Sequence, residues 1–139
     1  MESKIITQLI NSAQNAQKNA HAPYSGFQVG AAVLTQDDRI FSGCNVENAA
    51  YPLGQCAEAT AIGSMVTDGT KIIKAVVIAS PNEELCFPCG GCRQKLAEFA
   101  EDATPVYMVT AKGHIEKHTV GDLLPHAFRL RHDGTTDKA

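Results

Sequence analysis

The pattern of apolar positions along the chain changes between a helical and an extended repeat, and it predicts a mixed α/β protein. In residues 2–19, apolar side chains from Ile5 to Ala16 recur near helical spacing, which is typical of an amphipathic helix. Residues 71–79 are a β-branched run instead, as expected for a strand that is buried on both faces. The same patterns predict helices at 56–67 and 90–101, a helical turn at 120–124, and strands at 27–35, 39–44, 105–110 and 114–119.

The order of these elements predicts the fold class. One helix is followed by two strands, and then come a helix, a strand, a helix and a final pair of strands. Helices that alternate with strands around a short sheet favour a three-layer α/β/α sandwich. The helices between strands are long enough to permit parallel crossovers in part of the sheet. We assign a single domain to residues 1–128 and expect residues 129–139 to form a polar C-terminal tail.

Composition and charge narrow the class of ligand. Hydrophobic residues make up 44% of the chain and charged residues 19%, which is ordinary for a globular protein. The formal charge of −3 and the absence of a basic cluster disfavour a nucleic-acid polymer and favour a small, weakly charged ligand. The longest apolar run, residues 75–79, is too short to cross a membrane, and no secretory signal is visible. We therefore expect a cytoplasmic protein without membrane association.

The cysteines carry the first chemical signal. Their odd number and the lack of an export signal argue against a disulfide framework. Cys86, Cys89 and Cys92 follow the spacing C-x2-C-x2-C, and Cys89 immediately precedes a predicted helix, where free N–H groups favour thiolates. With Cys56 at the start of another helix, Cys89 and Cys92 supply three ligands for Zn²⁺ and leave the fourth position to water, as in catalytic sites. Cys44 is expected to be a small hydrophobic residue at a strand end.

A carboxylate stands next to this candidate metal centre. Glu58 follows Cys56 by two residues, an offset that can bring its carboxylate beside the metal without ligating it. A carboxylate in that place can carry protons for a zinc-bound water. The sequences C-A-E at 56–58 and P-C-G-G-C at 88–92 match the signature H-x-E…P-C-x-x-C of the zinc nucleobase deaminases, with cysteine in place of histidine.

Three further segments extend the similarity beyond the zinc motif. They read F-Q-V-G-A-A at 27–32, N-V-E-N-A-A-Y at 45–51 and L-L-P-H-A-F at 123–128. With them, residues 5–128 resemble the small cytidine deaminases, the homotetrameric enzymes that hold zinc with three cysteines. The resemblance implies an α/β/α sandwich with a mixed five-stranded sheet, a zinc ion, and active sites that draw on more than one subunit. It also implies hydrolytic deamination of cytidine and deoxycytidine to uridine and deoxyuridine with release of ammonia, a reaction of pyrimidine salvage.

The resemblance also assigns roles to single residues. It implies that Phe27 packs on the pyrimidine, and that Asn45 and Glu47 hydrogen-bond the hydroxyls of the ribose. It further implies that the Ala57 backbone and Glu58 contact the edge of the base. A neutral nucleoside suits such a set, because it offers hydroxyls, a polar edge and π-faces. By residue type alone, Phe27 is equally a core residue and Glu47 a solvated carboxylate in a loop.

The remaining roles concern neighbouring subunits and the charge of the metal site. The resemblance implies that Tyr51 and Phe128 complete pockets of neighbouring subunits. Ala59 departs from the family, which usually has arginine directly after the catalytic glutamate. Three thiolates and one Zn²⁺ leave a charge of about −1, which weakens the metal as a Lewis acid. We expect the two helix N-termini and Arg93, behind the ligands, to offset that charge in place of the missing arginine.

Two other functions compete with this interpretation. The first is deamination of a related aminopyrimidine nucleoside such as blasticidin S, against which Asn45 and Glu47 argue as ribose ligands. The second is a structural zinc module that binds a protein partner. It requires Cys86 as a fourth ligand and gives Glu58 no role. A deaminase that edits nucleic acids is disfavoured by the charge balance and the short chain.

Overall fold

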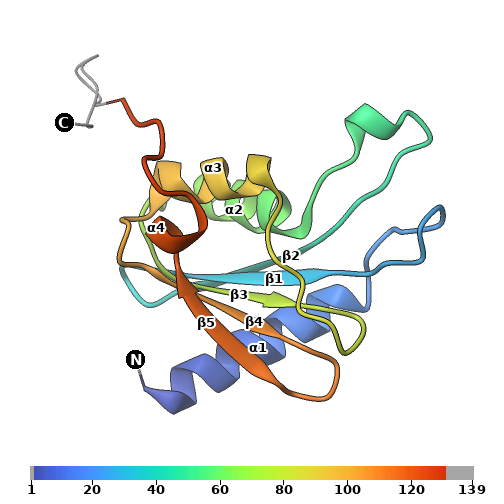
Figure 1. Ribbon diagram of the computed structural model, residues 1–139, viewed down its shortest axis with the longest axis horizontal. Coiled ribbons are helices and arrows are strands. Elements are labelled where there is room, and N and C mark those ends of the chain that lie inside the picture. Colours follow the sequence, from blue (N-terminus) through green and yellow to red (C-terminus); the bar gives the residue numbers. More distant parts are fainter. Residues whose placement is uncertain (1, 131–139) are drawn as a thin grey trace.

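The computed structural model describes residues 2–130 and shows a five-stranded sheet with helices on both faces (Figure 1). The helices are α1 (Ser3–Gln17), the 3-10 turn η1 (Tyr51–Leu53), α2 (Ala57–Thr67), α3 (Gly90–Phe99) and α4 (Val120–Leu123). The strands are β1 (Gly30–Thr35), β2 (Ile40–Cys44), β3 (Ile73–Ala79), β4 (Pro105–Val109) and β5 (Ile115–Thr119). The predicted α/β class is therefore confirmed. Most of the predicted C-terminal tail, residues 131–139, lies outside the described residues.

The sheet has the strand order β2-β1-β3-β4-β5 and is mixed. Only β3 and β4 pair in parallel, and the other neighbouring strands are antiparallel. Short turns join β1 to β2 and β4 to β5, whereas the parallel pair is connected through α3, because a parallel connection needs a crossover. The predicted mixed sheet of five strands is confirmed.

Alternate residues of the central strands supply two separate cores. One core packs against α1 and consists of Leu9, Ala13, Ala32, Leu34, Ala75, Val77, Ala79, Tyr107 and Val109. The other packs against α2, α3 and α4 and includes Ala31, Val33, Ala61, Met65, Val76, Ile78, Leu96, Val106, Met108 and Val120. In Figure 1, α1 accordingly lies below the sheet, and α2, α3 and α4 lie above it. In the described part of the chain, no helix is long and apolar enough to cross a membrane.

Several elements are shorter than their hydrophobic patterns predict. The first strand begins at Gly30 instead of residue 27, because the backbone before it is bonded mainly by the side chain of Asn45, with one backbone bond from Asn45 N to Val29 O at 3.3 Å. The Asn45 amide accepts from Val29 N at 2.9 Å and donates to Phe27 O at 2.8 Å. Helix α3 ends at Phe99 instead of residue 101, because Ala100 adopts an extended backbone.

The parallel pairing of β3 with β4 brings the starts of α2 and α3 to one edge of the sheet. Helix α2 leads into β3 and α3 leads into β4, so each helix runs back along the strand that follows it. Because the two strands point the same way, both helix N-termini lie beyond the same strand ends. In α/β sheets, the carboxyl ends of parallel strands are where ligands usually bind.

A small ladder outside the main sheet connects the loop before β1 with the start of α2. His21 pairs with Val46 in parallel, and Val46 pairs with Gln55 in antiparallel. The Val46 and Gln55 backbones exchange two hydrogen bonds of 2.8 Å. The chain between them, including η1, therefore forms an arm that is closed at its base, and it projects beyond the sheet in Figure 1. Gln55 directly precedes Cys56, so the ladder ends at the candidate metal centre.

Gly43 of β2 allows α2 to approach the sheet. A Cβ at this position would lie 2.4 Å from Ala61 N and 2.7 Å from Ala57 O, which are backbone atoms. We therefore expect Gly43→Ala to push α2 outward and to lower the free energy of unfolding by about 1–3 kcal/mol, the usual cost of overpacking. Chemical denaturation followed by circular dichroism measures this loss.

Gly63 provides the matched control for that variant. It lies on the exposed side of α2, with no atom within 4 Å of an added Cβ. Gly63→Ala is expected to be neutral or stabilising, because alanine has the higher helix propensity. Equal stability of the Gly43→Ala variant and the unmodified protein would contradict the close packing of α2 on β2.

Candidate active site and metal centre

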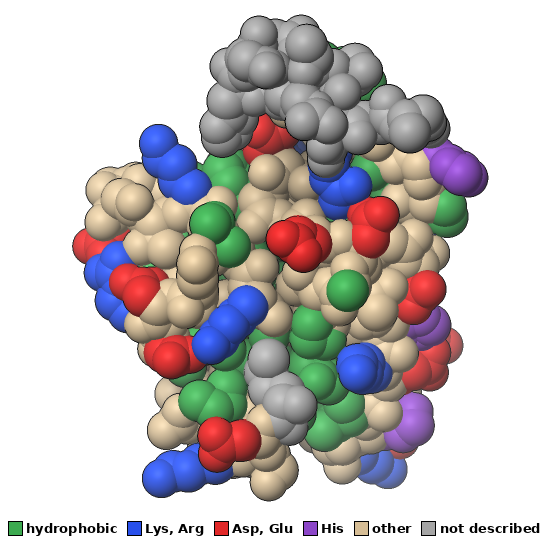
Figure 2. All heavy atoms as spheres, turned by 90° about the vertical axis from the view of Figure 1, so that its left-hand side faces the viewer, with side chains coloured by type: hydrophobic (Ala, Val, Ile, Leu, Met, Phe, Trp, Pro, Cys, Tyr) green, Lys and Arg blue, Asp and Glu red, His purple; other side chains and the backbone are tan. Residues whose placement is uncertain are grey.

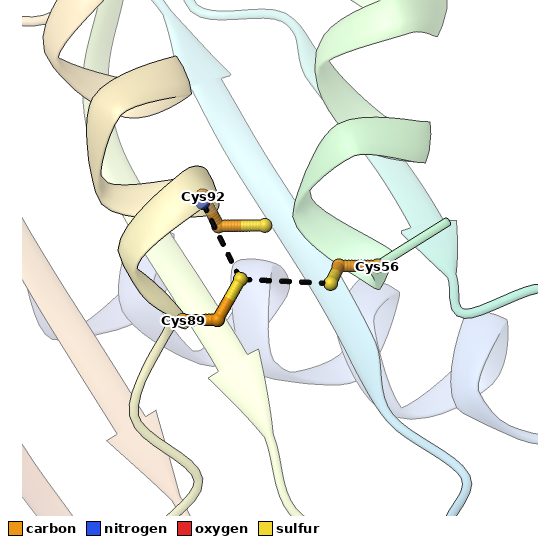
Figure 3. A group of neighbouring side chains, drawn as sticks. All are labelled: Cys56, Cys89 and Cys92. Atoms are coloured by element: carbon orange, nitrogen blue, oxygen red, sulfur yellow. Dashed lines mark hydrogen bonds between the residues drawn. The ribbon is translucent and has the colours of Figure 1, made fainter. Parts of the chain in front are cut away.

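Three thiols converge where α2 and α3 begin (Figure 3). The Sγ atoms of Cys56, Cys89 and Cys92 all lie within 4.8 Å of one another. The distance between Cys56 Sγ and Cys89 Sγ is 3.8 Å. Two thiolates that bind one tetrahedral zinc ion at about 2.3 Å lie about 3.8 Å apart. The donor set and its spacing therefore fit zinc, with three protein ligands and one open position.

The helix starts explain why these three residues meet. Cys56 is the N-cap of α2 and Cys89 is the N-cap of α3, and both have extended backbones. Cys92 lies in the first turn of α3, and its N–H donates to Cys89 Sγ at 3.5 Å. N–H groups in the first turn of a helix have no partner within the helix, and they stabilise thiolates as they stabilise other anions. Three cysteines from two separate motifs thus share one favourable environment.

The three thiols differ in their tendency to ionise. Burial is the largest influence on each, and it raises the pKa of Cys56 and of Cys92, which also lie close to other negative groups. For Cys89, the effect of burial is outweighed by hydrogen bonds from the Cys92 backbone and from the Cys92 and Cys56 thiols, so its pKa is lowered. A divalent cation favours the ionised form of all three, because its charge dominates such a site.

Glu58 is the buried carboxyl group of the site. It lies in the first turn of α2 and is only 4% exposed. Burial raises the pKa of Glu58, and the positive charge of Lys95 acts in the opposite direction. Burial thus makes the protonated form of Glu58 more accessible, and general acid and base chemistry requires a group that can both accept and donate a proton.

Cys86 is separate from the three-thiol group. Among the described residues, the group that could hold a metal ion contains Cys56, Cys89 and Cys92 but not Cys86. The Cys86 side chain is half-buried against the core beneath α2 and α3. Burial, followed by the nearby negative groups, raises its pKa to about 11, so at neutral pH it is a thiol. This arrangement speaks against the structural zinc module with four cysteine ligands.

Arg93 binds backbone carbonyls beside the metal centre. Its Nε donates to Pro88 O at 2.7 Å, and its Nη1 donates to Leu123 O at 2.8 Å. These bonds fix the chain directly before Cys89 and tie it to α4, whereas the sequence led us to expect a charge that acts on the thiolates. The offsetting of thiolate charge by Arg93 stays a prediction.

The loops before β1 and after β2 hold each other through side chains. Asn45, expected as a ribose ligand, uses one amide hydrogen and one lone pair on the backbone of residues 27–29. The Glu47 carboxylate accepts from Tyr24 N at 3.0 Å, from Ser25 N at 3.2 Å and from the Ser25 hydroxyl. These bonds, the Ser25 hydroxyl foremost, lower the pKa of Glu47 and keep it ionised. Both residues therefore have a structural task in addition to the predicted contact with the ribose.

The predicted aromatic residues lie at the surface of the single chain. Phe27 is 39% exposed, Phe128 63% and Tyr51 76%. Tyr51 packs edge-on against Tyr24, with ring centroids 6.1 Å apart. A cavity of about 330 Å³ is lined by Tyr24, Ser25, Glu47, Asn48, Tyr51 and Gly54. The predicted sugar-binding side of the site thus opens between the loop before β1 and the arm.

Comparison with known proteins connects this geometry to a family. Residues 3–109 match the family model of the cytidine and deoxycytidylate deaminase zinc-binding region. The matched segment includes Cys56, Glu58, Cys89 and Cys92. The chain belongs to this deaminase family. The resemblance inferred from the sequence is therefore confirmed, and the three thiols are the zinc-binding group of a zinc-dependent deaminase family.

Individual relatives are similar over nearly the whole chain. The cytidine deaminase of Sporosarcina psychrophila is 46% identical over 123 residues, which cover 88% of this chain and 90% of the relative. The cytidine deaminase of Halalkalibacterium halodurans is 42% identical and covers 86% of this chain and 91% of the relative. The crystal structure of cytidine deaminase from Burkholderia pseudomallei superposes with a TM-score of 0.85 at 39% identity, covering 92% of this chain and all (100%) of that one. The deaminase fold is thus shared over 92% of this chain.

Sequence reasoning missed two residues of the deaminase site. Ser25 lies between Pro23 and Gly26, residue types that are typical of a turn, but a turn signal does not indicate where a hydroxyl points. Lys95, whose charge acts on Glu58, follows Cys92 by three residues on α3. Residues three apart lie on the same face of a helix, so this spacing is a signal that could have identified Lys95.

Proposed function

We propose that this protein is a zinc-dependent cytidine deaminase that converts cytidine and deoxycytidine to uridine and deoxyuridine with release of ammonia, a step of pyrimidine salvage. The observation that carries the proposal is the placement of a buried carboxyl group, Glu58, two residues from one of three converging thiols. The family membership and relatives named as cytidine deaminases at 42–46% identity support the substrate.

The proposal assigns the three thiols to the metal and the proton transfers to Glu58. Cys56, Cys89 and Cys92 would hold zinc. When bound, zinc acts as a Lewis acid that lowers the pKa of a coordinated water. Glu58 accepts a proton from the attacking water and transfers it to N3 of the pyrimidine. It then assists the departure of the amino group from C4, so water and cytidine yield uridine and ammonia. Each of these transfers requires that Glu58 change its protonation state, and burial of its carboxyl group favours such changes.

The loops supply the groups that would bind and orient the nucleoside. The first-turn N–H of Ala57 has no partner within α2 and would donate to the edge of the base. The exposed ring of Phe27 would cover one face of the pyrimidine. Asn45 retains one amide hydrogen and Glu47 retains acceptor capacity, and both would be directed to the sugar hydroxyls.

A homotetramer with shared active sites completes the proposal. The exposure of Tyr51 and Phe128 in the single chain supports it, because large aromatic side chains at the surface often mark interfaces. Light scattering coupled to gel filtration tests the assembly, and a monomeric mass for the active, zinc-loaded protein would contradict it.

The deciding experiment for the function is chromatography of zinc-loaded protein incubated with cytidine. Uridine is the expected product. Failure to convert cytidine, together with turnover of blasticidin S or another aminopyrimidine from a panel, would replace the proposal with the alternative deaminase. Failure with every substrate at full zinc content would contradict deamination altogether.

Ala59→Arg is expected to raise turnover of cytidine or to leave it unchanged. Ala59 is half-buried in the first turns of α2, close to Cys56, and an arginine there would add positive charge beside three thiolates. Less surplus negative charge makes the metal a better Lewis acid. Steady-state kinetics at full zinc content measure the effect, with Ala59→Gln as the uncharged control. A large loss of turnover in folded, zinc-loaded Ala59→Arg that is absent in Ala59→Gln would contradict the charge argument.

A further inference from the structure

The Ser25 hydroxyl lies between two residues that the proposed function assigns to the substrate. It donates a hydrogen bond to the Glu47 carboxylate, and it accepts from Phe27 N at 3.0 Å. Both interactions depend on a tight turn, in which Gly26 adopts a φ of 71° and donates from its N–H to Ala22 O at 2.9 Å. A positive φ is readily available to glycine, so Gly26 lets the chain reverse directly after Ser25.

Hydrogen bonds from this turn occupy most of the acceptor positions of the Glu47 carboxylate. Its Oε1 accepts two backbone N–H groups, from Tyr24 and Ser25, and its Oε2 accepts the Ser25 hydroxyl. A carboxylate has about four acceptor positions in total. One position therefore remains, on the same oxygen that the Ser25 hydroxyl holds. The direction of that remaining lone pair is set by Ser25.

The location of Ser25 links this geometry to ligand binding. Ser25 and Glu47 both line the cavity between the turn and the arm, together with Tyr51. The Glu47 N–H donates to His21 O at 2.7 Å, so the backbone of this residue is fixed as well. Because the ladder holds the backbone of Glu47, the hydrogen bond from the Ser25 hydroxyl sets the rotation of the Glu47 carboxylate.

We propose that Ser25 is a positioning residue for the sugar of the nucleoside. Its hydroxyl orients the free lone pair of Glu47 toward a secondary hydroxyl of the ribose. The inference rests on the proposed function and extends it. It implies that binding of the sugar depends on the turn before β1, because Ser25 lies in that turn. Ser25 touches neither the metal ligands nor Glu58 through the hydrogen bonds described, so it acts on binding more than on the chemical step.

The test compares Ser25→Ala on two ligands. Cytidine carries all the sugar hydroxyls, whereas 2′,3′-dideoxycytidine lacks both secondary hydroxyls and keeps only the 5′-hydroxyl. We expect the KM for cytidine to rise by roughly ten-fold, as for loss of a hydrogen bond to a charged group. The inhibition constant of 2′,3′-dideoxycytidine against cytidine, which reports its binding whether or not it is turned over, should change by less than about two-fold. The kcat for cytidine should change little.

Two single variants and a double-variant cycle separate positioning from general damage. Ser42→Ala removes an exposed hydroxyl from β2 and should leave both ligands unaffected. In a double-variant cycle, the effect of Ser25→Ala should shrink markedly when Glu47 is already alanine, because the two residues then act as one unit. Ser25→Thr retains a hydroxyl and should recover at least part of the affinity for cytidine.

Different results would contradict the role of Ser25 and the proposed function. Equal weakening of cytidine and 2′,3′-dideoxycytidine, or additive effects of Ser25→Ala and Glu47→Ala, would overturn the positioning role. An unchanged KM for cytidine in Ser25→Ala would overturn it as well. Absence of cytidine turnover in the unmodified, zinc-loaded protein would instead refute the proposed function itself.

Discussion

Glu58→Gln is expected to lower kcat for cytidine by at least about 10²–10⁴-fold, the contribution typical of one general acid and base. The amide has nearly the same shape as the carboxyl group but cannot accept, carry and return a proton. Because Glu58 is buried and is not one of the three converging thiols, the fold and the zinc content should be retained. Steady-state kinetics, elemental analysis and thermal unfolding on one preparation measure the three quantities together.

Glu98 offers a matched control for this variant. It is a glutamate on α3 whose side chain is exposed to solvent, whereas Glu58 is buried. Glu98→Gln should keep turnover, zinc content and stability unchanged, as is usual for surface substitutions. Turnover close to that of the unmodified protein in Glu58→Gln would refute the assigned mechanism. A loss of zinc would instead mean that the carboxyl group supports the metal.

Cys89→Ala is expected to remove most of the zinc and, with it, the activity. Cys89 caps α3, and of the three thiols it is the one whose pKa is lowered, so it is the most readily available as a thiolate. Zinc affinity depends on the number of deprotonated ligands, and two thiols of raised pKa remain after the substitution. Elemental analysis after dialysis against a chelator measures the retained metal.

Cys86→Ala is the control for the loss of zinc. Its thiol is half-buried, lies outside the three-thiol group and stays protonated at neutral pH, because burial raises its pKa to about 11. Zinc content should therefore match that of the unmodified protein, although stability should fall because a small buried group is removed. Full zinc content in Cys89→Ala, or loss of zinc in Cys86→Ala, would show that the ligands are assigned incorrectly.

The hydrophobic pattern was sufficient to predict the elements of the fold. Strand β3 is buried along nearly its whole length, so its β-branched run is a clear signal, and the repeat from Ile5 to Ala16 reflects the packing of α1 on the sheet. The ends of elements are less predictable. Residues 27–29 have the composition of a strand, but Phe27 O and Val29 N are bonded by the side chain of Asn45, a residue that is distant in the sequence.

The candidate site could be predicted where it depends on helix starts. Cys56 and Cys89 are followed immediately by helices, and the topology of α2 and α3 brings these starts together. The partners of Glu47 and Arg93 could not be predicted, because most of their hydrogen bonds go to backbone groups in other segments. Such bonds follow from the path of the chain and leave no residue pattern of their own.

The surface of the protein carries charges of both signs. On the face shown in Figure 2, Lys and Arg side chains lie between Asp and Glu side chains, and hydrophobic atoms are visible among them. Mixed charge of this kind provides solubility without a strong field of one sign. Within the site, the pKa of Glu58 is raised by burial and the pKa of Glu47 is lowered by hydrogen bonds.

The closed base of the arm has a consequence for how this protein can change. The bridge between Val46 and Gln55 fixes the points at which the chain leaves the body and returns to it. The chain between these two points can therefore change in length or sequence without altering the path of the chain into Cys56, so long as Tyr51 keeps its place in the cavity. The arm can therefore vary and gain new contacts while α2 and α3, which carry the three thiols, keep their places.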